Sequence, residues 1–241
     1  MKSGRKAGVG LLVTFLILVG ILVLADRGAA WAAESKISDQ VAQKAAEKKI
    51  QMADKPEVTV EGFPFLTQVI GGEFQAVDIK MRKLSLDGVN IDSLDVRATN
   101  VKADVGQLMN GTGDVRAGEI TGKATVAYDQ IQELVGMDGA KVTGKDGKLR
   151  ITVPVDLGPT TVTALATASV KVSDGGIKIQ VDDVSVKQAD LPEAVRSEVA
   201  NNLSRTIGLP KLPYGLAVRD ATVTDAGIVA TASARDVPLT S

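Results

Sequence analysis

A long stretch of alternating apolar and polar residues, from Glu57 to Val186, constrains the fold more than any other feature of the chain. Alternation with a period of two places every second side chain on one face of a β-strand. Asp-Gly pairs that begin at positions 87, 138, 146 and 174 offer the positive φ angles of tight hairpin turns. The pattern therefore predicts a long antiparallel meander. Its clearest runs are Val77 to Leu86, Val89 to Ala98, Ile120 to Tyr128, Leu149 to Val155, Val162 to Val172 and Ile177 to Val181.

Helical spacing of apolar residues appears on both sides of this meander and once within it. Ser35 to Met52 predicts a first amphipathic helix, which Pro56 terminates. Asp190 to Ile207 predicts a second, because an apolar residue recurs at every fourth position. A short helical insert is predicted from Tyr128 to Val135, with Gly136 as its stop. A final strand pair is predicted at Leu216 to Val223 and Ile228 to Ala234.

These elements predict an α+β domain in which a strongly curved antiparallel sheet wraps around two long amphipathic helices. The strands are rich in Ala, Thr, Val and Gly, as in residues 160–172. Small side chains fill little volume, so a curved sheet lined with them leaves room for an elongated apolar space. Tight packing of the sheet on its helices is the alternative, since small residues also permit close approach.

The first 33 residues are expected to lie outside this domain, which then covers residues 34–241. Three basic residues precede an uncharged apolar run from Ala7 to Ala25. As a helix, at ~1.5 Å per residue, the run spans ~28 Å, close to the ~30 Å hydrocarbon core of a bilayer. The basic residues predict a single-pass anchor in the cell membrane with the domain on the extracytoplasmic side. A signal peptide cleaved near Ala32 is the alternative, which would give a secreted or periplasmic protein, and the length of the run favours the anchor.

Composition excludes several classes of activity. The chain contains no cysteine and no histidine, which removes disulfides, thiolate nucleophiles, the usual zinc ligands and every His-based catalytic arrangement. We therefore expect neither an enzyme nor a metal site, and a hydrolase built on paired carboxylates is the enzymatic alternative. Without Lys2, Arg5 and Lys6, the 28 basic residues fall to 25 against 29 acidic ones, which disfavours nucleic-acid binding.

Three of the four phenylalanines lie close together, at Phe63, Phe65 and Phe74. Large rings gain most from burial, so this segment either anchors the core or lines an apolar ligand site. The one dense basic cluster, Lys80 to Lys83 around Met81, has two interpretations. It is either a solvated strand edge or a contact for anionic lipid head groups.

The segment from Val58 to Phe74, which contains Gly62-Phe63-Pro64-Phe65-Leu66 and Gly71-Gly72, resembles the LmeA-family phospholipid-binding proteins. The resemblance runs from about Ser35 to the carboxyl terminus and includes the insert from Tyr128 to Gly136. It implies an exported bacterial domain related to tubular lipid-binding (TULIP) domains. It also implies non-enzymatic binding of a phosphatidylinositol-type phospholipid, support of lipomannan-type glycolipid assembly in the cell envelope, and an envelope glycosyltransferase as a candidate partner.

The resemblance also implies where an acyl chain would lie, and it requires no cofactor. The head group is expected near Lys80 and Arg82. Each buried methylene contributes ~0.8 kcal/mol, so apolar burial is expected to dominate affinity. An envelope scaffold that docks a membrane enzyme without holding lipid is the alternative function. The expected lipid-binding residues are Phe63, Phe65, Leu66, Phe74, Ile79, Met81, Val195, Val199 and Leu203.

Overall fold

The computed structural model describes residues 3–86, 89–110, 112–135, 139–156, 161–173, 176–186, 192–208 and 212–240. Its helices are α1 (Ser3–Glu47), α2 (Phe65–Gly71), α3 (Val105–Met109), α4 (Tyr128–Val135), α5 (Glu193–Leu203) and the 3-10 helix η1 (Pro213–Gly215). Its strands are β1 (Gln51–Met52), β2 (Glu57–Glu61), β3 (Glu73–Leu86), β4 (Val89–Ala103), β5 (Val115–Val126), β6 (Lys141–Lys145), β7 (Lys148–Asp156), β8 (Thr161–Ser173), β9 (Gly176–Val186), β10 (Arg205–Gly208), β11 (Ala217–Val223) and β12 (Ile228–Pro238).

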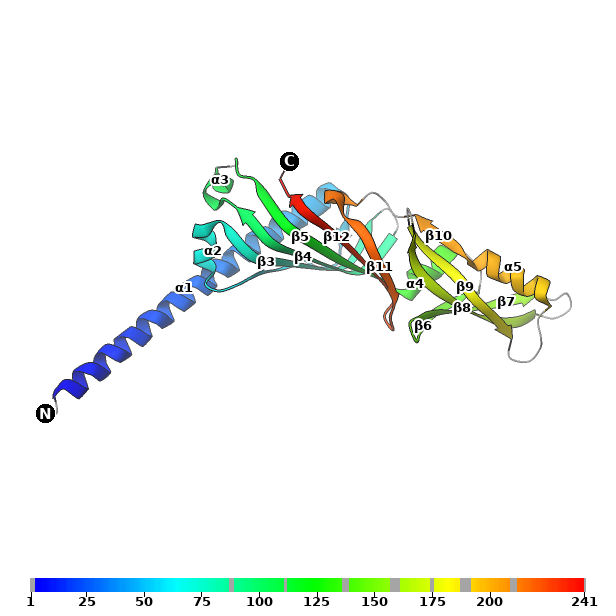
Figure 1. Ribbon diagram of the computed structural model, residues 1–241, viewed down its shortest axis with the longest axis horizontal. Helices are drawn as coiled ribbons and strands as arrows, with labels where there is room; N and C mark the ends of the chain where they lie inside the picture. The colour runs from blue at the N-terminus through cyan, green and yellow to red at the C-terminus, as the bar shows by residue number, and fades with distance from the viewer. Residues whose placement is uncertain are drawn as a thin grey trace.

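The strands form two antiparallel sheets that lie end to end along the molecule (Figure 1). Sheet A has the order β1-β3-β4-β5-β12-β11, with β2 also paired to β3, and sheet B has the order β10-β9-β8-β7-β6. The α+β class and the antiparallel pairing are confirmed. The prediction of one strongly curved sheet around two long helices is wrong. The described part of the chain has five α-helices, and neither sheet is strongly curved or closed.

Pairing between strands far apart in sequence explains this difference. β12 returns from the end of the chain to pair with β5, where Ala230 lies opposite Ala124. That pairing completes sheet A and leaves β6 to β10 to form a sheet of their own. The local alternation of each strand does not encode such a partner. The insert at α4 is confirmed and lies between the two sheets in the chain.

The tight turn between β6 and β7 is confirmed. Asp146 and Gly147 have φ angles of 55° and 72°, as a two-residue hairpin turn requires. The predicted turns at 87–88 and 174–175 and the helix stop at Gly136 lie outside the described residues.

The predicted first helix is the carboxyl-terminal part of a much longer one. α1 runs without a break from Ser3 to Glu47, and Gln51–Met52 form a short strand instead of the last helical turn. Residues 26–34 contain alanines and no proline, so nothing between the apolar run and Ser35 interrupts the helix. The apolar segment is therefore joined to the domain by continuous helix.

The helix predicted from Asp190 to Ile207 is shorter than expected. α5 ends at Leu203, and Ser204 takes an extended conformation. Residues 205–208 become β10, in which Ile207 lies opposite Ile177 of β9. The open edge of β9 offers backbone partners that outweigh helical spacing for the β-branched Thr206 and Ile207. The predicted start at Asp190 lies outside the described residues.

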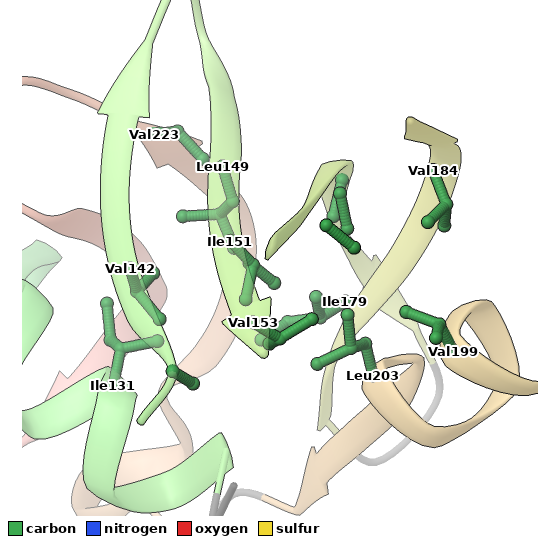
Figure 2. Close-up of a cluster of buried hydrophobic side chains, with 14 of the residues drawn as sticks. Ile131, Val142, Leu149, Ile151, Val153, Ile179, Val184, Val199, Leu203 and Val223 are labelled. Carbon is green, nitrogen blue, oxygen red and sulfur yellow. The ribbon is translucent and has the colours of Figure 1, made fainter. Parts of the chain in front are cut away.

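The largest core lies between sheet B and its helices. Figure 2 shows Leu203 of α5 beside Ile179 and Val153, and these three side chains have no accessible surface. Val223 and Ile228 of sheet A also join this core and connect the two sheets. Its buried members are Ile131, Ala140, Val142, Leu149, Ile151, Val153, Ala164, Ala166, Ala168, Ile179, Val184, Val199, Leu203, Val223 and Ile228.

Candidate functional site

One face of sheet A carries a group of half-buried apolar side chains beside a small buried core of Val101, Ala117, Ile120 and Val237. The strand register places Ile79 opposite Val96 and Met81 opposite Leu94. Across the next strands, Leu94 lies opposite Ala124, and Ala124 opposite Ala230. We call this group the sheet A face. Its members are Phe74, Val77, Ile79, Met81, Leu94, Val96, Ala98, Ala124 and Ala230, none of which is fully buried.

Helix α1 packs along one margin of the sheet A face. Ala30 of α1 and Val60 of β2 are buried together with Phe65 of α2. The rings of Phe65 and Phe74 lie 6.2 Å apart between centroids, so Phe74 connects this margin to the sheet A face. The middle of the face, around Ile79 and Met81, keeps accessible surface.

Polar contacts fix α1 at this margin. The buried carboxylate of Asp26 accepts a hydrogen bond of 2.8 Å from the Leu66 N–H. Glu34 Oε1 accepts another of 2.8 Å from the Val60 N–H. The hydroxyl of Ser38 donates to the Pro56 carbonyl. These bonds tie α1, from Asp26 to Ser38, to α2 and to the segment around β2, so this part of α1 belongs to the folded domain.

The two predicted head-group residues point away from the sheet A face. Lys80 and Arg82 alternate with Ile79 and Met81 along β3, and successive side chains of a strand lie on opposite faces. Arg82 Nη1 lies 3.2 Å from Asp95 Oδ1 on the opposite, polar face. Neither cation is positioned beside the apolar side chains that it was expected to accompany.

An ion-pair network occupies the same polar face. Arg97 contacts both Glu61 and Asp78, and its Nη1 lies 2.7 Å from Asp78 Oδ2. The hydrogen bond from Arg97 holds the pKa of Glu61 below its usual value. Partial burial, and then the neighbouring Glu61, raise the pKa of Asp78. Sheet A therefore has one charged, solvated face and one apolar face, as is common in antiparallel sheets.

The remaining predicted lining residues lie elsewhere. Val195, Val199 and Leu203 of α5 belong to the sheet B core, where Leu203 is fully buried. Phe63 and Leu66, at the start of α2, are largely exposed. The structure thus brings Phe65, Phe74, Ile79 and Met81 together on one side of sheet A, and separates them from the α5 residues.

Six members of the sheet A face were not among the expected lipid-binding residues: Val77, Ala124, Ala230 and three residues of β4, Leu94, Val96 and Ala98. The signal for the β4 residues was present. A two-residue turn at positions 87–88 would pair Leu86 with Val89, and counting outward from that pair puts Leu94 opposite Met81, as the structure has it. The register of the hairpin, rather than the aromatic cluster alone, marks this surface.

A shallow pocket lies between α2 and α3. Its volume is about 470 Å³, and Gly72 at its wall has a φ angle of 66°. Its charges are mixed, since Lys102 pairs with Glu73 at 3.3 Å and Asp104, Asp114 and Arg116 also line it. No group of three side chains suited to a metal ion occurs among the described residues.

Of the helices described, one, α1, is long and apolar enough to cross a membrane. Its side chains from Phe15 to Leu24 are exposed, and in Figure 1 this part of α1 extends beyond sheet A as a lone helix. This is consistent with a membrane anchor or a signal segment.

Comparison with known proteins gives one match. A family model described as LmeA-like phospholipid-binding matches residues 24–233. No curated protein and no solved structure matches the chain. The match begins within α1, at the end of the apolar run, and includes nearly all of both sheets.

Proposed function

The chain belongs to the LmeA-like phospholipid-binding family, and on that premise we propose that it is a membrane-anchored, non-enzymatic phospholipid carrier whose sheet A face holds the acyl chain. Membership of the family supports lipid binding in general. The half-buried sheet A face is the observation that supports lipid binding in this half of the molecule. Phe65, at its α1 margin, contributes to the wall beside Phe74.

Apolar contact is the proposed main source of affinity on this surface. Half of a sixteen-carbon chain contributes ~6 kcal/mol at ~0.8 kcal/mol per methylene, before the entropic cost of association. The nearby ion pairs all lie on the opposite face of sheet A, so no charge has to be desolvated beneath the chain. The proposed recognition is therefore mainly apolar.

The contacts of α1 favour an anchor that is retained. Cleavage near Ala32 would remove Asp26 and Ala30, which are both buried against the domain. A free domain would lose the hydrogen bond between Asp26 and the Leu66 N–H. We therefore propose a single-pass protein whose domain lies on the extracytoplasmic side.

The proposed role in the cell envelope is inferred from the family alone. By analogy with the family, we propose a phosphatidylinositol-type lipid as the ligand and lipomannan-type glycolipid assembly as the process. An envelope glycosyltransferase is the proposed recipient. This role rests on the family resemblance, whereas the proposed acyl-chain site rests on the exposure of the sheet A face.

A charge placed on the sheet A face tests the acyl-chain site. The full-length chain is purified in mild detergent, and its bound phospholipid is measured by native mass spectrometry. We expect Met81→Asp to lower phospholipid occupancy about tenfold or more, because a carboxylate cannot be desolvated against an acyl chain.

Lys80→Asp is the matched control. It introduces the same carboxylate at the neighbouring position of β3, on the polar face, and it should leave occupancy unchanged. Equal loss in the two variants, or no loss in either, would overturn the assignment of lipid to the sheet A face.

A further inference from the structure

Three large apolar side chains at one end of sheet A are exposed without a covering element among the described residues. Phe63 is 62% exposed, Leu66 41% and Ile70 87%. All three lie in or directly before α2, and we call them the α2 tip. The single tryptophan of the chain, Trp31, is 71% exposed on the adjacent α1. Exposed aromatic and aliphatic side chains gathered in this way are typical of an interaction surface.

The α2 tip is fixed at the point where α1 stops being apolar. Asp26 is the first charged residue after the apolar run that ends at Ala25. Its Oδ1 accepts a hydrogen bond of 2.8 Å from the Leu66 N–H. The Arg27 guanidinium lies 5.4 Å from the centre of the Phe63 ring, and its Nη2 donates to the Gly62 carbonyl. The tip therefore cannot lie far from the plane at which α1 leaves the hydrocarbon.

The arrangement of the whole molecule agrees with this position. In Figure 1, α2 and α3 lie at the end of sheet A from which α1 extends alone toward the N terminus. Sheet B and α5 lie at the opposite end. A bilayer around the apolar part of α1 would thus meet the α2 end of the domain first.

We propose that the α2 tip inserts into the interface of the same bilayer that α1 spans. This inference rests on the membrane anchor of the proposed function. Tryptophan and phenylalanine favour the level of the head groups, where a ring is shielded from water, and an arginine beside them extends its charged group to the surface. The continuity of α1 with the tip, through Asp26 and Arg27, identifies the partner as this membrane and not a second protein.

Insertion of the α2 tip would also orient the sheet A face. Phe65 lies between the tip residues Phe63 and Leu66 in the chain and contacts Phe74, so the apolar side chains continue from the tip onto the sheet. With the tip docked, the edge of the sheet A face would lie beside the bilayer. The lipid that this face is proposed to bind would then be close to it. The tip is therefore a surface for lipid access, distinct from the surface that holds the acyl chain.

Depth-dependent quenching of tryptophan tests this proposal on the full chain. The protein is reconstituted in phosphatidylcholine vesicles whose acyl chains are brominated near the head group. Because Trp31 is the only tryptophan, Trp31→Phe combined with Phe63→Trp places the single reporter at the tip. Trp31→Phe combined with Ser197→Trp places it on the exposed side of α5, at the far end, as a matched control.

We expect brominated lipid to lower the emission of the reporter at position 63 by about twofold or more, and that at position 197 not at all. Ile70→Trp in the same background serves as a second tip reporter and should behave like position 63. Equal quenching at the tip and on α5, or none at either tip position in protein that floats with the vesicles, would overturn the proposal.

Lipid occupancy, measured in parallel, separates this inference from the proposed function. Quenching at the tip with an empty sheet A face would support membrane docking and contradict lipid carriage. Bound phospholipid without quenching at the tip would contradict docking alone.

Discussion

The two halves of the molecule are built from similar strands but are covered differently. Sheet B is rich in small residues such as Ala164, Ala166 and Ala168, and α4 and α5 close over it until no accessible surface remains on these side chains. Sheet A has comparable residues at Ala98, Ala124 and Ala230, yet these stay half-buried, and the buried contacts of α1 lie at the β2 margin. Strand composition is thus shared, and the helical cover decides which face can accept a ligand.

The two halves of the molecule therefore have different proposed roles. The sheet B core supplies stability, since its apolar side chains are buried against one another. Part of the apolar surface of the sheet A face is accessible to solvent. Exposure of this surface to water is unfavourable, so an acyl chain that covers it would be stabilised there. Three substitutions test this difference between the two halves.

Leu203→Ala should cause the greatest loss of stability. Leu203 is fully buried among Ile179 and Val153, so its truncation leaves a cavity and is expected to lower the free energy of unfolding by ~3 kcal/mol. Urea unfolding of the detergent-solubilised chain, followed by circular dichroism, measures the change. Asn202→Ala, at the exposed neighbouring position of α5, should have little effect. A cost below ~1 kcal/mol would show that this core is less tightly packed than described.

Asp26→Ala should loosen the tie between α1 and α2. The Leu66 N–H loses its acceptor, and its hydrogen exchange is expected to accelerate about tenfold while that of the sheet B amides stays unchanged. Asp39→Ala is the control on the same helix, because Asp39 is exposed and pairs only with the exposed Lys55 in the described structure. Equal protection of Leu66 in both variants would contradict the proposed role of Asp26.

Leu94→Ala should have the smallest effect on stability and a clear effect on lipid. The side chain is half-buried on the sheet A face, so the free energy of unfolding is expected to fall by ~1 kcal/mol or less. The same substitution at Leu203 is expected to cost ~3 kcal/mol. Phospholipid occupancy, measured by native mass spectrometry, should decrease. A loss of stability as large as that of Leu203→Ala would mean that the sheet A face is an ordinary core.

The sequence predicts the strands and their faces well. The runs from Val77 and from Val89 are confirmed as β3 and β4, because alternation directly reports which side chains share a face. The same rule already places Lys80 and Arg82 on the other face of β3 from Ile79 and Met81. The expectation that they contact the head group did not take this alternation into account.

What the sequence does not predict depends on contacts between distant segments. The pairing of β12 with β5, which separates the two sheets, has no local signal. The regular spacing of Val195, Val199 and Leu203 correctly marks the apolar stripe of α5, but spacing alone cannot tell a helix that lines a groove from one that closes a core. The burial of Asp26 is equally invisible, since its partner, the Leu66 N–H, belongs to the backbone.

Photocrosslinking with a phospholipid that carries a diazirine in its acyl chain tests most directly which half of the molecule holds lipid. The full-length chain is labelled in detergent, digested, and mapped by mass spectrometry. Crosslinks are predicted on β3 and β4, around Ile79, Met81 and Leu94. Crosslinks on α5 and β9 instead would contradict the account, and a chain that takes up no phospholipid at all would favour a scaffold that docks a membrane enzyme.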